Sequence, residues 1–225
     1  MSADSPLLRA GIAARFAQVR QQTQALCTNL TAEDMQLQSM PDASPAKWHL
    51  AHTTWFFETF VLAHDPAWKP RDPAWHYLFN SYYQSVGPMH VRAQRGLLSR
   101  PSLDEVRDYR RRVDEAVLAL LDRRDDPELA SLVELGLQHE QQHQELLLTD
   151  IKHAFWCNPL QPALRPAIAA SAHAPPVPLR FIAGREGIVE IGHRGEGFAF
   201  DNETPRHRAL LQPHALANRL VTNAE

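Results

Sequence analysis

Two histidines lie four residues apart in a stretch with helical periodicity, His139-Glu140-Gln141-Gln142-His143. On an α-helix this spacing places both imidazole rings on one face, about one turn apart. Two neutral imidazoles so placed can bind the same divalent metal ion. The pair therefore predicts a long helix at this point of the chain, carrying part of a metal site that a further ligand must complete.

Four segments carry apolar residues at helical spacing, and they predict a mainly α fold. They cover about residues 5–30, 44–63, 102–124 and 128–156. The second opens at Ser44-Pro45, where Ser44 fits an N-cap and proline the first helical position. The third opens at Ser102, where Glu105 completes a capping box. Helices of this length predict an up-down four-helix bundle with a metal site between facing helices.

Two further expectations concern the packing of this bundle. Core candidates on the last helix are Leu132, Leu135, Leu146 and Ile151. A connection of nearly forty residues separates the second predicted helix from the third. Because loops of that length are uncommon in compact domains, we expect it to be functional or to contain short elements of its own.

The character of the sequence changes after Pro159. Residues 159–178 contain six prolines and many alanines, which predicts a linker. Residues 179–225 alternate short apolar runs with glycines, which predicts strands and turns. That stretch is short for an independent core. We expect a helical domain over 1–158, a linker over 159–178, and the opening of a second domain over 179–225 whose remainder lies outside this sequence.

Charge and composition narrow the range of partners. The formal net charge is −3, from 23 basic and 26 acidic residues, which gives no electrostatic reason to expect nucleic acid or an anionic membrane. No apolar run approaches the roughly 20 residues of a membrane span, and no signal peptide is apparent after Met1. The two cysteines, Cys27 and Cys157, do not form a disulfide framework. A reducing, cytoplasmic setting is the simplest expectation.

The second predicted helix offers His49 and His52 as the missing ligand. His52 shares a face with Trp48 and Trp55, so it can point into the bundle toward His139 and His143. Three histidines leave coordination positions open for a substrate or dioxygen. The alternative is that these histidines are packed core residues, which is the more frequent role of a lone histidine on an apolar helix.

Glu140 admits several roles. The His-Glu-x-x-His pattern matches zinc proteases, in which the glutamate is the general base. No further ligand motif follows His143, which disfavours that class. Glu140 can instead orient a ligand histidine, or simply face water.

Five strings together carry a resemblance to one family. They are Ser-Pro-Ala-Lys-Trp-His-Leu-Ala-His-Thr-Thr-Trp-Phe-Phe-Glu (44–58), Phe-Asn-Ser-Tyr-Tyr (79–83), Gly-Pro-Met-His-Val-Arg-Ala-Gln-Arg-Gly-Leu-Leu-Ser-Arg-Pro (87–101), Gln-His-Glu-Gln-Gln-His-Gln-Glu (138–145) and Gly-Phe-Ala-Phe-Asp-Asn-Glu (197–203). Over most of residues 40–225 the chain resembles the ergothioneine-biosynthesis sulfoxide synthases, non-haem iron enzymes of the EgtB type. The resemblance implies a DinB-like four-helix bundle followed by an incomplete α+β, C-type-lectin-like segment related to formylglycine-generating enzyme (sulfatase-modifying factor).

The resemblance also implies a reaction and a set of site residues. It implies Fe(II) held by His52, His139 and His143, and the use of dioxygen to join a thiol sulfur to the imidazole of hercynine, giving a sulfoxide. Arg92 and Arg95 match loop arginines that hold the carboxylates of the thiol, and Gln142 matches a glutamine that contacts the hercynine ring. The family's tyrosine proton donor and much of its hercynine pocket lie in the second domain, beyond residue 225. A chain with this extent is expected to keep the metal ligands and to lack those groups.

Several alternatives stay open beside this hypothesis. A C–Se synthase acting on a selenosugar shares these motifs, and the thiol donor of a C–S synthase is either γ-glutamylcysteine or cysteine. A DinB-like thiol transferase using zinc or nickel fits the bundle, although the 197–203 string disfavours it. A non-enzymatic bundle that binds metal or a partner is a further alternative. The oligomeric state is also open.

Overall fold

The structure is a computed structural model that describes residues 5–81, 86–166, 177–195, 197–222 and 225. The chain divides into two compact units, Met1–Pro166 and Ala167–Glu225. The first is helical, and the second contains short strands, so the chain as a whole is mainly α. Part of the predicted linker, residues 167–176, lies outside the described residues. Among the described residues, no helix combines the length and apolar character that crossing a membrane requires.

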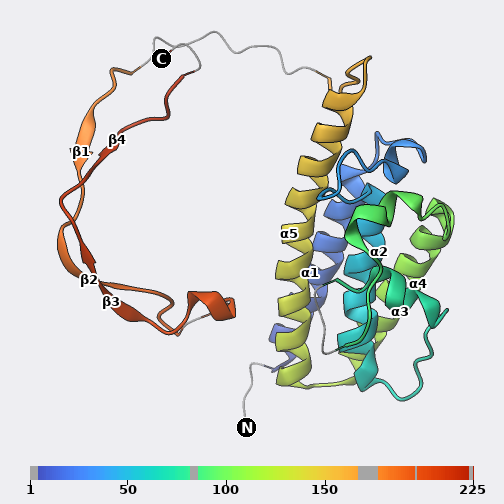
Figure 1. The fold of residues 1–225 in the computed structure, drawn as a ribbon. Coiled ribbons are helices and arrows are strands. Elements are labelled where there is room, and N and C mark those ends of the chain that lie inside the picture. The colour runs from blue at the N-terminus through green and yellow to red at the C-terminus, as the bar shows by residue number, and fades with distance from the viewer. Residues whose placement is uncertain (1–4, 82–85, 167–176, 196, 223–224) are drawn as a thin grey trace. The chain divides into compact units, whose positions relative to one another are not determined.

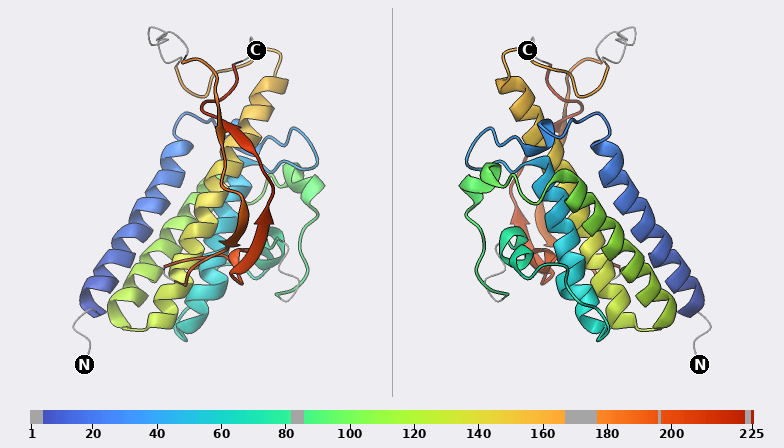
Figure 2. Two further views of the ribbon diagram at one scale, coloured as in Figure 1. Left: turned by 90° about the vertical axis from the view of Figure 1, so that its left-hand side faces the viewer. Right: turned by 90° about the vertical axis from the view of Figure 1, so that its right-hand side faces the viewer.

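Four long helices make up most of the described first unit: α1 (Ser5–Leu26), α2 (Ala46–Phe56), α4 (Leu103–Arg123) and α5 (Pro127–Cys157). Each of α1 and α2 packs against both α4 and α5. Helices α1 and α5 run in one direction and α2 and α4 in the other, as Figures 1 and 2 show. The simple up-down order is therefore wrong, because the long connection after α2 carries the chain back before α4 begins.

Two of the helix starts follow from local sequence. Ser102 accepts a hydrogen bond from the backbone N–H of Glu105, whose carboxylate accepts one from the Ser102 N–H, so the capping box is confirmed. The Asp126 carboxylate caps α5 by accepting from the backbone N–H groups of Glu128 and Leu129, with Pro127 in the first turn. The predicted Ser44 cap is wrong. Pro45 occupies the cap position of α2, and the Ser44 hydroxyl instead accepts a hydrogen bond from Arg95.

Helix α2 is the centre of this unit, since all eleven of its residues are buried. After Phe56 the helix continues as one π-helical turn (Phe57–Val61) and a 3₁₀ turn (Leu62–His64). Gly136 lets α5 approach this region closely, because a Cβ at that position would lie 2.5 Å from the Phe57 ring. The close approach brings the histidine-bearing part of α5 within side-chain reach of α2.

Two of the core candidates on α5 are placed differently from the prediction. Ile151 is buried and Leu132 is partly buried, whereas Leu135 and Leu146 are 37% and 43% exposed. Leu146 lies on the face of α5 that also carries His139 and His143, because residues 139, 143 and 146 follow helical spacing. That face borders a cavity rather than the hydrophobic core.

The connection between α2 and α4 contains short elements, as expected for a segment of that length. They are α3 (Ala74–Phe79) and a 3₁₀ helix (Arg92–Leu97). The indole N–H of Trp48 donates to the backbone carbonyl of Leu78, which anchors α3 against α2. Another 3₁₀ turn (Asp34–Gln36) lies between α1 and α2.

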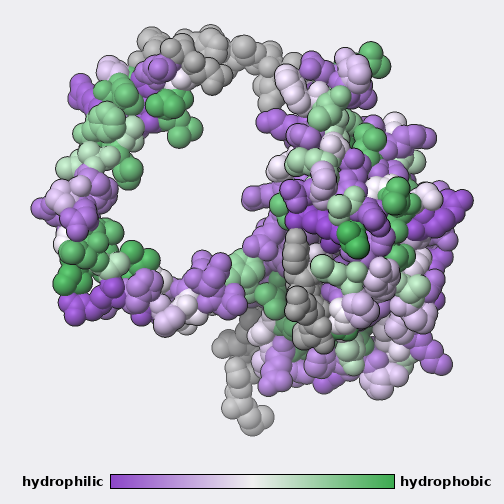
Figure 3. All heavy atoms as spheres, in the orientation of Figure 1, coloured by the Kyte–Doolittle hydropathy of each residue, from purple (hydrophilic) through white to green (hydrophobic). Residues whose placement is uncertain are grey.

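The second unit contains two antiparallel two-stranded ladders. β1 (Phe181–Ala183) pairs with β4 (Ala215–Ala217), and β2 (Gly187–Ile191) pairs with β3 (His207–Leu211). None of the described residues of this unit is buried. Hydrophobic atoms are visible at the surface of both ladders in Figure 3. Two-stranded ladders without a covered face are only marginally stable alone. The described residues of 179–225 form strands and turns, as predicted, and they form no core.

Candidate metal centre

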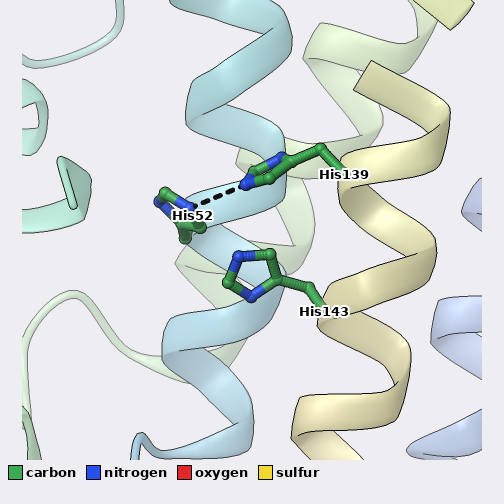
Figure 4. Close-up of side chains that lie close together, drawn as sticks. All are labelled: His52, His139 and His143. Atoms are coloured by element: carbon green, nitrogen blue, oxygen red, sulfur yellow. Dashed lines mark hydrogen bonds between the residues drawn. The ribbon is translucent and has the colours of Figure 1, made fainter. Parts of the chain in front are cut away.

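Three histidines from two helices converge in the interior of the helical unit (Figure 4). His52 projects from α2, and His139 and His143 project from α5. One ring nitrogen from each lies within 4.8 Å of the other two, and the Nε2 atoms of His52 and His139 are 3.2 Å apart. The structure thus brings together the three residues that the sequence nominated as ligands. Among the described residues, these three histidines form the one group of three or more His, Cys, Asp or Glu side chains close enough together to bind a metal ion.

The spacing and the charge of these rings fit a divalent ion. Two nitrogens bound at about 2.1 Å to one ion lie about 3 Å apart when the angle between them is near 90°. Burial lowers the pKa of His139 to about 4, and burial together with the neighbouring His139 lowers the pKa of His52 well below its usual value. The pKa of His143 is lowered by burial and by the adjacent histidines. The imidazoles are therefore neutral near pH 7, as metal binding requires.

The His52 ring is fixed on both faces and at one nitrogen. It stacks on Trp48 with centroids 4.5 Å apart and on Trp55 with centroids 5.6 Å apart. Its Nδ1 lies 2.6 Å from the backbone oxygen of Phe79. Since a carbonyl oxygen only accepts, Nδ1 carries the proton and Nε2 presents its lone pair toward the other histidines.

Aromatic side chains of α2 lie beside two of the histidines. Trp48 and Trp55 flank His52, as expected for the tryptophans of this helix. Phe57 instead packs edge-on against Phe16 at 5.0 Å. The ring of Phe56, one residue earlier, lies 4.8 Å from His139. The helical rotation of 100° between neighbouring residues separates these two roles.

A cavity of about 280 Å³ opens beside the histidines and is lined by both predicted arginines. Arg95 is 3% exposed, and it donates to the hydroxyls of Ser44 at 2.9 Å and Ser81 at 3.0 Å. Its guanidinium carbon lies 3.4 Å from the centre of the Trp48 ring, within cation–π range. Arg92 is partly exposed and donates to the backbone oxygen of Asp42. Gln142 is exposed and is not among the residues that line this cavity.

Sequence comparison assigns the helical part of the chain to a family. The model of the DinB superfamily matches residues 15–147, which is more than half of the chain and includes all three histidines. The chain belongs to the DinB superfamily. Domains of this superfamily often bind metal ions and are often metal-dependent enzymes. No curated protein matches the chain.

Glu140 of this DinB-superfamily protein turns away from the histidines and is fully buried. It accepts hydrogen bonds from Arg20 at 2.7 Å, from Thr23 at 2.5 Å, and from Arg110. Burial alone would raise the pKa of this carboxyl, but the charges of Arg110 and Arg20 outweigh it and lower the pKa to about 2. Of the roles left open for Glu140, an orientation toward water is wrong, and its engagement with two arginines leaves it in no position to act as a protease general base.

Two further residues contact the site, His49, which the sequence offers as an alternative ligand, and Asp150, which was not predicted from the sequence. His49 lies with Nδ1 2.9 Å from Nδ1 of His143, and its Nε2 lies 3.0 Å from the carboxylate of Asp150. His49 was weighed as a ligand, but both of its ring nitrogens are engaged here. Asp150 follows His143 by seven residues, which is two helical turns, so its place on the same face was available from the spacing.

Proposed function

We propose that this DinB-superfamily protein binds Fe(II) through His52, His139 and His143 and forms a C–S bond between a thiol and the imidazole of hercynine, using dioxygen and yielding a sulfoxide. The observation that carries the proposal is the convergence of three neutral imidazoles, one buried and two partly buried, beside a cavity lined by Arg92 and Arg95. The three-histidine set supports metal binding, and the arginines support a carboxylate-bearing substrate.

The protein's own residues would bind and orient the reactants. When bound, Fe(II) supplies open coordination positions and redox chemistry with dioxygen. Arg95, held by Ser44 and Ser81, can form two parallel hydrogen bonds to a substrate carboxylate at the cavity wall. Both γ-glutamylcysteine and cysteine carry such a group. Trp48 and Trp55 stack on the His52 ring and shield it from water. Gln142 would contact the hercynine ring.

The experiment starts with anaerobic titration of Fe(II) into the metal-free protein. One ion per chain is expected, and the double variant His139→Ala/His143→Ala should bind none at that site. The exposed His64 supplies a matched control, because His64→Ala leaves the three rings untouched. Unchanged iron binding in the double variant would overturn the proposed ligand set.

The reaction is tested on the iron-loaded protein with hercynine, dioxygen and either thiol. Oxygen consumption and the hercynyl sulfoxide, detected by mass spectrometry, are the expected outcomes, and a selenosugar in place of the thiol tests the C–Se alternative. Arg95→Met should raise KM for the thiol at least tenfold, whereas the exposed Arg100→Met should leave it unchanged. Iron binding without oxygen consumption with any of these substrates would overturn the oxygenase proposal.

A second candidate function is a zinc-dependent thiol transferase. The observation in its favour is the donor set, since three neutral imidazoles without a carboxylate are typical of catalytic zinc, whereas many non-haem iron oxygenases use two histidines and one carboxylate. Metal analysis after purification with and without oxygen separates the two. Zinc in both preparations, with thiol transfer and no oxygen uptake, would favour the transferase.

A further inference from the structure

A chain of hydrogen bonds leads from a buried carboxylate to one of the three histidines. Asp150 Oδ2 accepts from the backbone N–H of Ser44 at 2.8 Å and lies 3.0 Å from His49 Nε2. His49 Nδ1 in turn lies 2.9 Å from His143 Nδ1. Asp150 and His49 are 9% and 2% exposed, so the chain is largely shielded from solvent.

The donors and acceptors along this chain can be assigned in only one order. A carboxylate oxygen accepts, so His49 Nε2 carries a hydrogen and donates a hydrogen bond to Asp150. The neutral His49 ring then has a lone pair on Nδ1, which must accept from His143 Nδ1. His143 therefore carries its proton on Nδ1, and its Nε2 is the nitrogen left to bind an ion.

We infer that Asp150 and His49 form a positioning relay that fixes the tautomer and ring orientation of His143, so that its Nε2 faces the shared ion. The inference rests on the proposed metal site and concerns residues that do not themselves bind the ion. Hydrogen-bonded partners of this kind increase the basicity of a ligand histidine and hold its ring in place.

The relay parallels the device that holds His52 but uses different groups. His52 obtains the same tautomer from the backbone oxygen of Phe79. His143 obtains it from a side chain of α2 that is itself oriented by a side chain of α5. The relay thus links the two ligand-bearing helices, and the Ser44 amide joins the segment before α2 to the same carboxylate. A change at His49 should therefore be felt at His143 and not at His52.

The test uses two substitutions at one position. His49→Leu removes both hydrogen bonds of the relay, so His143 Nδ1 loses the acceptor that His49 provides. His49→Gln keeps an amide that can donate to Asp150 and accept from His143. Thr23→Val is the matched control, because Thr23 is buried and hydrogen-bonded to Glu140 but has no contact with the relay. Each protein is titrated with Zn²⁺, a diamagnetic probe, against a competing chelator, and its unfolding is followed with no metal present.

We expect His49→Leu to weaken zinc binding about 10- to 100-fold, which is the usual effect of losing such a partner. His49→Gln should recover affinity to within about threefold of wild type, and Thr23→Val should match wild type. A ¹⁵N spectrum of the histidine rings in the zinc-loaded wild type should show His143 protonated at Nδ1 and bound through Nε2. The zinc affinities and the ¹⁵N spectra are measured without thiol or hercynine, so failure of the proposed reaction does not affect these results.

Three results would overturn the inference. One is wild-type zinc affinity in His49→Leu, and another is a His143 ring bound to zinc through Nδ1. The third is a His49→Gln variant as weak as His49→Leu although it unfolds like wild type, since that would show that the imidazole packs there without acting as a relay. A wild-type protein that binds no zinc would overturn the relay together with the metal site.

Discussion

Two polar clusters lie on different faces of α5, and the neighbouring residues His139 and Glu140 belong to different clusters. Glu140 belongs to a charged cluster with Arg20, Arg110 and Asp114. His139 belongs to a histidine cluster with His49, His52 and His143. Both clusters lie within the part of the chain that matches the DinB superfamily, apart from Asp150 at the edge of the second.

The clusters differ in how their polar groups are satisfied. In the charged cluster every Glu140 oxygen faces a guanidinium, and Arg20 also bonds Asp114 at 2.6 Å and Thr54 at 2.9 Å. In the histidine cluster one ring nitrogen from each of His52, His139 and His143 lies within 4.8 Å of the other two. Both Glu140 oxygens are bonded to protein groups, whereas the histidine cluster provides lone pairs suited to a cation. One face of α5 therefore contributes to the stability of the fold, and the other provides the candidate metal ligands.

The largest effect should come from breaking the charged cluster. Glu140→Ala leaves Arg20 and Arg110 buried without their shared carboxylate, which should lower the free energy of unfolding by about 3–5 kcal/mol. Chemical denaturation measures this, and Glu145→Ala, at an exposed acidic position of the same helix, should change it by less than about 0.5 kcal/mol. Equal stability of the two variants would show that the Glu140 pairs are not needed for folding.

Acid should affect His139 and Glu140 in successive pH ranges. The pKa of His139 is lowered to about 4 in the folded protein from an ordinary 6.5, so the unfolded chain binds more protons between these values. Stability of the metal-free protein should therefore fall as pH decreases from 6.5 to 4, by about 3 kcal/mol from this ring alone. The pKa of Glu140 is lowered to about 2 from 4.5, so its contribution is present above pH 4.5 and is lost between 4.5 and 2.

A variant separates these two ranges. Between pH 6.5 and 4.5, His139→Leu should reduce the slope of unfolding free energy against pH by the contribution of one bound proton. Below pH 4.5 the decrease in stability that Glu140 causes should remain. The measurement is urea denaturation of metal-free protein across this pH range. An unchanged slope above pH 4.5 in the variant would mean that His139 is not buried as a neutral ring.

Metal should stabilise through the histidine cluster alone. At a free zinc concentration 100 times the dissociation constant, the gain is about 2.7 kcal/mol if the unfolded chain does not bind. Thermal unfolding of wild type with and without zinc should show this increase, and the double variant His139→Ala/His143→Ala should show none. A zinc-induced shift that survives in the double variant would place the site elsewhere in the chain.

The sequence predicted the histidine cluster better than the charged one, for a physical reason. The spacing of His139 and His143 fixes a common face on any helix, and the tryptophans beside His52 indicated a buried surface. The partners of Glu140 come from α1 and α4, and no local spacing relates Arg20 or Arg110 to it. Its sequence neighbours, His139 and the exposed Gln141, gave no sign of its complete burial.

Fold prediction succeeded where local signals were strong and failed where packing decided. The capping box at Ser102 located the start of α4. The exposed positions of Leu135 and Leu146 could not be read from hydrophobicity, since they depend on which face of α5 borders the cavity. Helix α2 is buried on all sides, so its hydrophobic periodicity does not indicate which face points to the core. The hydrogen bonds of the folded protein are what distinguish the roles of His49 and His52.

The smallest change that still distinguishes the clusters is Thr23→Val. The Thr23 hydroxyl donates to Glu140 at 2.5 Å and accepts from Gln144 at 3.0 Å, and it also lies 3.2 Å from the backbone oxygen of Val19. Valine has nearly the same shape, so it removes these contacts and little else. The free energy of unfolding should fall by about 1–2 kcal/mol, because Glu140 keeps both arginines. Zinc affinity should stay within about twofold, because none of these contacts reaches the histidine rings. A loss of affinity as large as that of His49→Leu would mean that the Glu140 side of α5 sets the positions of His139 and His143, and that the two faces of the helix act as one unit.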